Sequence, residues 1–332
     1  MQLLITTYSS YALRAAWLMF FLFLFAFPAM AQETPEERKK REEDQQKNTE
    51  QLRQTNPDDT LLGWTRAGQL TLNFGQVALS NWAQGGESSF SLLGLANYNA
   101  DFKSETKFWY NRFDATYGML KAGTEPLLKS DDRFDLLSKA GTKAFGDFYY
   151  AGLLNFTTQF TPTFTEGVYT SSFLSPATLI AALGLDYTPN PLFSFFVSPF
   201  TGKFTYVSDD ELAAKGAFGV PNGQHLRREF GAYIALLMQR DLMENINFQT
   251  KLKLFNNYTD PIAVNRKNVD INWETMFTFK VNKFFQAMLS TNLIYDHDTP
   301  IGIDLDGDKV ADTEGPRTQF KETFGLGISL KL

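Results

Sequence analysis

Apolar and polar side chains alternate along most of this chain, beginning near residue 68 and continuing to the last residue. In the stretch QLTLNFG, for example, every second residue from Leu70 to Phe74 is apolar. Alternation of this kind predicts β-strands with one apolar and one polar face. About twelve such segments can be recognised, over residues 68–80, 88–102, 107–119, 133–146, 148–160, 178–187, 192–205, 227–239, 245–256, 268–281, 284–296 and 318–332.

The lengths of these segments and of their links favour a membrane-spanning barrel. Most segments have 10–15 residues, which is long for a soluble strand but sufficient to cross a bilayer at a tilt. Tight turns, such as 103–106, 146–147 and 282–283, alternate with long loops. That asymmetry is typical of bacterial outer-membrane barrels. We therefore expect an all-β fold, a transmembrane antiparallel up-and-down β-barrel of about 12 strands, with both chain ends on the periplasmic side.

Aromatic residues gather at the predicted short turns. The chain has 32 Phe, 13 Tyr and 5 Trp, and four of the five short turns have aromatic residues on both sides, as in DFKSETKFWY at 101–110. In barrels, such rings form a girdle at the membrane–water interface. A soluble β-sandwich with cross-strand aromatic pairs is the alternative. The turn asymmetry and the export signal described next favour the barrel.

The N-terminal part of the chain has a different pattern, which predicts export. Arg14 is followed by thirteen apolar residues and then by the small-residue sequence AMA at 29–31. This order is typical of a cleaved signal peptide, and such an apolar run forms a helix of roughly 20 Å, too short for a bilayer. The charged segment 32–62 is poor in apolar side chains, so we expect a disordered or helical tether. The predicted organisation is a signal peptide at 1–31, a periplasmic tether at 32–62 and an outer-membrane barrel at 63–332.

Composition excludes several kinds of chemistry and partner. The chain has no cysteine and only two histidines, which excludes disulfides, thiolate chemistry and a multi-histidine zinc site. Its formal net charge of -6 leaves no basic surface for nucleic acid. The expected surroundings are the lipid bilayer with its lipopolysaccharide, together with other outer-membrane or periplasmic proteins.

The polar face of the predicted barrel carries many charges of both signs. A lumen of this strand number is narrower than that of the large porins, so we expect paired charges rather than a wide pore. We interpret the chain as a non-catalytic structural or accessory subunit of an envelope assembly, with a narrow transport pore as the alternative. The charged residues predicted to point inward are Arg112, Asp114, Arg133, Asp135, Lys139, Lys143, Asp186, Glu229, Lys251, Lys253, Asp270, Glu274, Lys280 and Lys321.

An outer-membrane lipase or esterase is a further alternative, because some barrels of similar strand number are hydrolases. Such an enzyme needs a nucleophile, a base and an orienting group within hydrogen-bond reach. His297 lies between two aspartates, Ser290 precedes it in sequence, and His225 lies in a long loop. Neither histidine accompanies a serine in a recognisable hydrolase motif, so we expect no enzymatic activity.

In the loop before the last strand, acidic residues are spaced as in a calcium-binding loop. Asp304, Asp306, Asp308 and Asp312 fall at positions 1, 3, 5 and 9 of a loop similar to those of EF-hand and thrombospondin type 3 repeats. The sequence departs from that pattern where a lysine replaces the usual glycine and where the final acid comes one residue early. A solvated Asp-Gly turn is the alternative. Any Ca²⁺ bound here is expected to bind weakly, with a Kd of roughly 10⁻⁴–10⁻³ M.

Four stretches together resemble a known family. They are LNFGQVALSNWAQGGESSFSL (72–92), WYNRFDATYG (109–118), KSDDRFDLLSKAG (129–141) and the closing PRTQFKETFGLGISLKL. They are similar to a family of Bacteroidota outer-membrane proteins known as domain of unknown function 3078, over roughly residues 60–332. The resemblance implies a monomer-sized β-barrel of the outer membrane, and it implies no catalytic residues.

Overall fold

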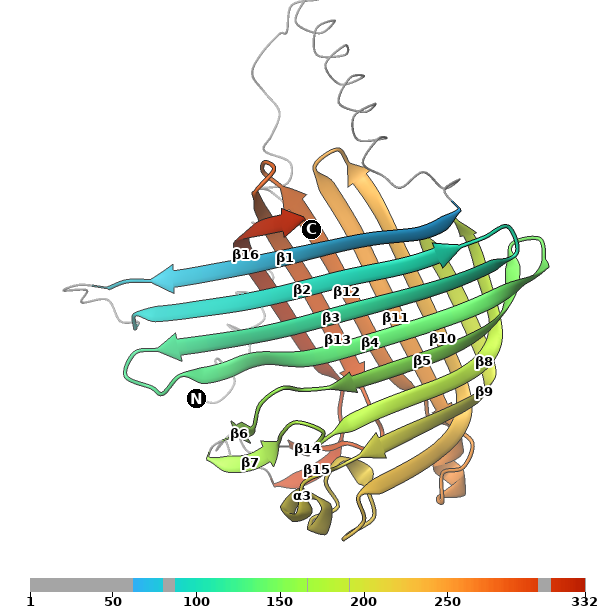
Figure 1. The fold of residues 1–332 in the computed structure, drawn as a ribbon. Coiled ribbons are helices and arrows are strands. Elements are labelled where there is room, and N and C mark those ends of the chain that lie inside the picture. The colour runs from blue at the N-terminus through green and yellow to red at the C-terminus, as the bar shows by residue number, and fades with distance from the viewer. Residues whose placement is uncertain (1–61, 80–86, 166, 191, 304–311, 332) are drawn as a thin grey trace, which may run out of the picture. The chain divides into compact units, whose positions relative to one another are not determined.

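The computed structural model describes residues 62–331, apart from 80–86, 166, 191 and 304–311. Within these residues, twelve antiparallel strands close into a barrel (Figure 1), which confirms the predicted fold class. The predicted signal peptide, and the tether up to residue 61, lie outside the described residues. The barrel strands are β1 (Gly63–Val77), β2 (Ser89–Lys103), β3 (Lys107–Ala122), β4 (Leu128–Phe145), β5 (Phe148–Thr158), β8 (Ala177–Asn190), β9 (Phe193–Tyr206), β10 (Leu226–Met243), β11 (Ile246–Asn257), β12 (Asp270–Lys280), β13 (Phe285–Tyr295) and β16 (Gln319–Lys331).

The outer face of the barrel is apolar, as the alternating pattern predicts. On β1, Leu70, Leu72 and Phe74 are exposed, whereas Thr71 and Asn73 between them are buried. Aromatic rings meet at the short-turn ends of the strands, and the ring centroids of Trp64 and Phe102 are 5.5 Å apart. This arrangement suits a wall that faces lipid, with an aromatic girdle at its border.

The long connections on the opposite side of the barrel contain small elements of their own. In the helix α3 (Asp210–Ala214), Asp209 caps the N-terminus by accepting a hydrogen bond from the Leu212 amide at 3.0 Å. Among the described residues, no helix is long and apolar enough to cross a membrane. The other elements are β6 (Thr163–Thr165), β7 (Val168–Ser171), η1 (Ala217–Gly219), η2 (Ala263–Lys267), β14 (Pro300–Ile303) and β15 (Thr313–Pro316).

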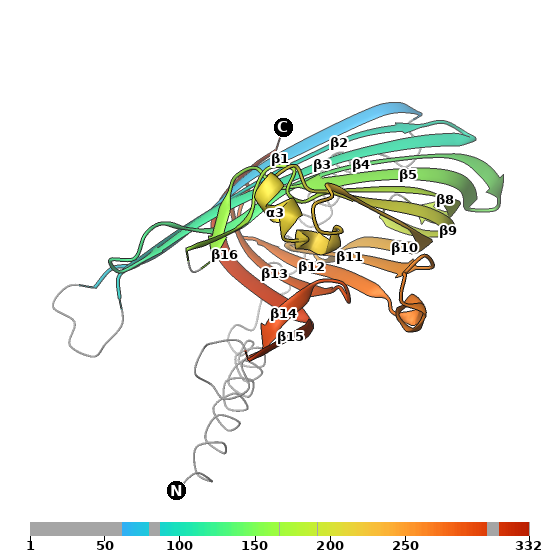
Figure 2. The same cartoon turned by 90° about the horizontal axis from the view of Figure 1, so that it is seen from below.

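The barrel is flattened rather than circular. Seen from below in Figure 2, strands β1–β5, β8 and β9 form one wall, and β10–β13 form the wall that faces it. A circular barrel of this strand number, tilted by about 40°, has a diameter of roughly 24 Å between backbones. Side chains of opposite walls nevertheless touch, as described below, so the two walls approach each other.

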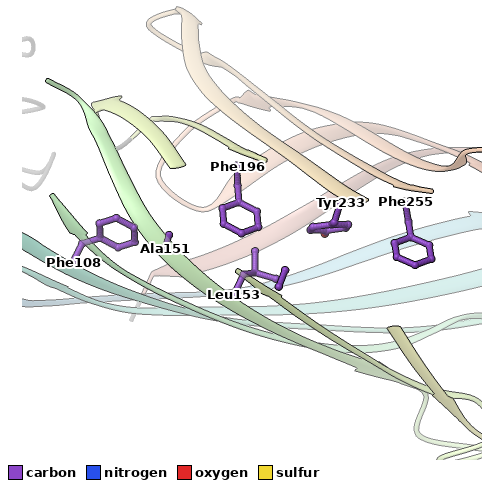
Figure 3. Close-up of a cluster of buried hydrophobic side chains, with 7 residues drawn as sticks. Phe108, Ala151, Leu153, Phe196, Tyr233 and Phe255 are labelled. Atoms are coloured by element: carbon purple, nitrogen blue, oxygen red, sulfur yellow. The ribbon is translucent and has the colours of Figure 1, made fainter. Parts of the chain in front are cut away.

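An apolar cluster fills part of the space between the walls. Phe108, Leu153, Phe196, Tyr233 and Phe255 are buried and converge from β3, β5, β9, β10 and β11 (Figure 3). Each of them points inward, because cross-strand register places it on the face opposite the exposed leucines and aromatics. Part of the lumen is therefore packed like the core of a soluble protein.

Close approach of two backbones requires glycine at position 184. A Cβ atom there would overlap the carbonyl oxygen of Val197 on the neighbouring strand, at a β-bulge between β8 and β9. We expect Gly184→Ala to destabilise the barrel by about 1–3 kcal/mol, because the backbone has to shift. Urea unfolding of the refolded protein measures the change in the free energy of unfolding. Gly94→Ala is the control, since its nearest new neighbour would lie 3.7 Å away; equal losses in both variants would contradict the explanation.

Candidate functional site in the barrel lumen

The structure places the predicted inward charges on the lumen face of their strands. Asp114 and Asp135 are directly opposite each other on β3 and β4. Two carboxylates in such a pair repel each other unless cations lie close. Lys251 from β11 approaches Asp114 at 2.9 Å, and Lys253 approaches Asp135 at 3.4 Å. Lysines from β11 therefore neutralise an acidic pair on β3 and β4.

These ion pairs cross the lumen. In the barrel, five strands separate β11 from β3 in either direction around the ring. The same is true of β4 and β12, which are joined by an ion pair between Arg133 and Glu274. Arg133 also contacts Asp135 at 2.8 Å. Partners on diametrically opposite strands can touch only because the barrel is flattened. The flattening of the barrel and the pairing of its charges therefore occur together.

A second group of charges lies near the short-turn end of the lumen. Lys139 Nζ donates to Asp186 Oδ2 and to Ser194 Oγ, both at 2.6 Å. Thr188 Oγ1 donates to the same carboxylate at 2.7 Å. The ammonium group also lies 5.5 Å from the centre of the Phe108 ring. Asp186 is completely buried, so its charge depends on these donors.

A third group lies toward the long-loop end. Lys203 Nζ is 2.9 Å from Asp270 Oδ2 and 3.8 Å from Glu229 Oε2. Arg227 is 2.8 Å from Glu229 Oε1 and also pairs with Asp298, just after β13. These contacts join β9, β10 and β12 to a long loop. Among the described residues, no group of three or more His, Cys, Asp or Glu side chains is placed to hold a metal.

The sequence analysis missed several lumen charges, among them Asp101, Lys203 and Arg227. Lys203 lies in β9, where several phenylalanines obscure the alternation. Its inward position follows from its register opposite Glu229. A signal was present, because Thr201, Lys203 and Thr205 recur with period two at the end of that strand.

The barrel has a cavity in its lumen and a groove on its outer wall. A cavity of about 90 Å³ remains in the lumen between the crossing ion pairs. A shallow apolar groove of about 630 Å³ lies on the outer wall over β16, β1, β2 and β3. Gly94, Ala96 and Ala115 form its floor, while Leu70 and Tyr117 stand on either side.

The outer wall also carries a small polar network beside the aromatic girdle. Trp109 Nε1 donates to Ser138 Oγ at 2.8 Å, and Ser138 Oγ donates to Asn111 Oδ1 at 2.9 Å. Asn111 Nδ2 in turn donates to the Ala100 carbonyl at 3.1 Å. The side chains of Trp109, Ser138 and Asn111 thus donate hydrogen bonds to groups within the wall. These bonds reduce the free-energy cost of placing the three polar side chains against lipid or another apolar surface.

The residues considered for a hydrolase do not form a catalytic group. Ser290 lies within β13 and His297 lies beyond its end at Tyr295, so the intervening strand alone spans roughly 17 Å. His297 Nδ1 lies instead 3.3 Å from the Tyr295 hydroxyl. His225 Nδ1 contacts the Val207 carbonyl at 2.7 Å. The described residues thus bring neither histidine to Ser290.

Most of the predicted calcium loop lies outside the described residues. This applies to Asp304, Asp306 and Asp308, whereas Asp312 is exposed just before β15. The loop connects β14 to β15, between the last two barrel strands. The calcium site stays a prediction.

Comparison with known proteins bears on the family and the fold. Residues 74–164 match the family described as "Protein of unknown function (DUF3078)". This match confirms the resemblance to that family for the matched region, which runs from the end of β1 to β6. The lumen residues Arg112, Asp114 and Asp135 lie within it. No curated protein matches the chain.

Several solved barrels share the general architecture at very low sequence identity. The translocator domain of the autotransporter NalP from Neisseria meningitidis is 9% identical, with a TM-score of 0.34, over 87% of this chain and 95% of that one. The COG4313 outer membrane channel from Pseudomonas putida F1 is 10% identical, with a TM-score of 0.38, over 83% and 98%. OmpT of Vibrio cholerae is 9% identical, with a TM-score of 0.28, over 81% and 97%.

Proposed function

We propose that this protein is a non-catalytic outer-membrane β-barrel that serves as a structural or accessory subunit of an envelope assembly. Both chain ends would then lie on the periplasmic side, where the charged N-terminal segment is available to a partner. The observation that carries the proposal is the set of ion pairs that join opposite walls of the lumen. A lumen crossed by such contacts leaves little room for the passage of solute. The outer wall and the two ends of the barrel are then the surfaces at which a partner would bind.

The outer groove supports a protein contact within the membrane. Its floor of Gly94, Ala96 and Ala115 allows another backbone to approach closely, which is how packed segments associate in lipid. Aliphatic and aromatic side chains on both sides would hold the partner in place. The polar network around Ser138 is on the same wall, so a partner could meet both features.

Photo-crosslinking tests this role directly. A photoreactive amino acid replaces Ala96 in the groove or, as a matched control, Ala232 on the outward face of the opposite wall. After extraction in a mild detergent, mass spectrometry should find the same partner at a constant stoichiometry, crosslinked from position 96 and not from 232. Purification as a lone barrel without crosslinks, together with ion-conducting steps, would favour the narrow-pore alternative.

For the last long loop we propose weak Ca²⁺ binding through Asp304, Asp306, Asp308 and Asp312. Carboxylates at alternate positions supply the oxygen ligands that Ca²⁺ prefers. Millimolar CaCl₂ should raise the melting temperature of the purified barrel, and MgCl₂ at the same concentration should not. The shift should vanish in Asp306→Ala/Asp308→Ala. A shift that survives the double substitution would place the metal elsewhere.

A further inference from the structure

Among the described cations that line the lumen cavity, Arg112 is distinguished by a side chain without a direct partner. The other cations that line the inner cavity are Arg133, Lys139, Lys251 and Lys253, and each lies within 3.4 Å of a carboxylate oxygen. The Arg112 side chain lines the same cavity without a hydrogen bond or ion pair to any described residue. Asp101 attracts it electrostatically, but without direct contact.

Tyr233 also lines this cavity and carries a second polar group without a partner. Its side chain is only 1% exposed and sits in the apolar cluster between Phe196 and Phe255 (Figure 3). The phenolic hydroxyl is buried and has no hydrogen-bond partner among the described residues. A buried hydroxyl without a partner is costly, and each such group in a folded protein calls for an explanation.

We propose that the lumen cavity binds one small oxyanion, of the carboxylate or phosphate class, between the Arg112 guanidinium and the Tyr233 hydroxyl. The planar guanidinium presents parallel N–H donors that match two oxygens of such an anion. The hydroxyl donates a further hydrogen bond. Binding would satisfy both groups at once, and it does not depend on the proposed role as an accessory subunit.

The size and charge of the cavity agree with this ligand. A volume of about 90 Å³ accommodates a few water molecules or one small anion, and excludes a sugar or a peptide. The cavity lining has five cations and two carboxylates, Asp114 and Asp135. Those two carboxylates are already engaged by Lys251, Lys253 and Arg133. Arg112 is therefore the cation left for a mobile anion.

Equilibrium dialysis of the full-length barrel in detergent provides the test, with radiolabelled inorganic phosphate and acetate as separate probes at constant ionic strength. We expect saturable binding of one anion per chain, with the preferred probe identifying the class. Tyr233→Phe keeps the ring and removes only the hydroxyl, and it should weaken binding by about tenfold. Arg112→Gln should abolish measurable saturation. Arg66→Gln, on the exposed outer face of β1, should bind like the wild type.

Three results would overturn the proposal. One is the absence of saturable binding of either probe, as expected if Arg112 turns to contact Asp101 in solution. Another is equal binding in the wild type, Tyr233→Phe and Arg112→Gln, which would show a non-specific salt effect. The third is a loss of binding in Arg66→Gln as large as in Arg112→Gln. Because Tyr233→Phe changes one atom, the test holds even if Arg112→Gln does not fold.

Discussion

Lys139→Met should lower the free energy of unfolding of the barrel by about 3–5 kcal/mol. The substitution keeps the length of the side chain but leaves the Asp186 carboxylate without its cation. Lys139 is 7% exposed and Asp186 0%, so water does not replace the lost contact. Ser194 and Thr188 still donate hydrogen bonds to the carboxylate, but these neutral donors do not balance its charge. Urea unfolding in detergent, followed by tryptophan fluorescence, measures the loss.

The double variant Lys139→Met/Asp186→Asn should recover most of this stability. An amide at position 186 carries no charge and still bonds to the two hydroxyls, so no buried ion remains unpaired. Lys215→Met is the surface control, because its ion pair with Glu211 is 56% and 63% exposed and contributes less than about 1 kcal/mol. Failure of the double variant to recover would show that the lysine stabilises mainly by packing on Phe108.

Lys251→Ala/Lys253→Ala should turn a closed barrel into a cation-selective channel. The wild type is expected to give no conductance steps in a planar bilayer. The double variant removes the two long side chains that cross from β11 to β3 and β4, and should give steps roughly tenfold above that background. Asp114 and Asp135 then lose their lysine partners, so the reversal potential in a KCl gradient should move toward that of potassium.

Lys143→Ala/Lys280→Ala is the matched control for this channel. It removes the same charge from inward positions near the short-turn end, where neither lysine makes an ion pair among the described residues. It should stay closed. Steps of porin size in the wild type would contradict a lumen closed by ion pairs and would favour transport. Heat-modifiable mobility on gels confirms that each variant is folded.

The strands and their faces were predictable because both depend on the alternation of apolar and polar residues close together in the sequence. Each predicted segment overlaps one barrel strand, and the inward face of β11 follows from the alternation of Lys251 and Lys253 with Leu252 and Leu254. The first strand starts at Gly63 rather than residue 68, since Arg66 interrupts the apolar side of the pattern there. The exact pairing of charges was not predictable, because alternation gives the side of a residue and not the residue opposite it.

The sequence by itself determined the all-β class, the strand count, the alternation of short turns and long loops, and many of the charges that face inward. Each of these depends on residues near one another in the chain, and the bilayer requires every strand to pair. The tertiary structure alone decided that β11 faces β3, that the barrel flattens, and that Arg112 and Tyr233 share a cavity without partners. These features bring together residues more than a hundred positions apart in the sequence. They depend on how closely the two walls of the closed barrel approach each other when their charged side chains pair.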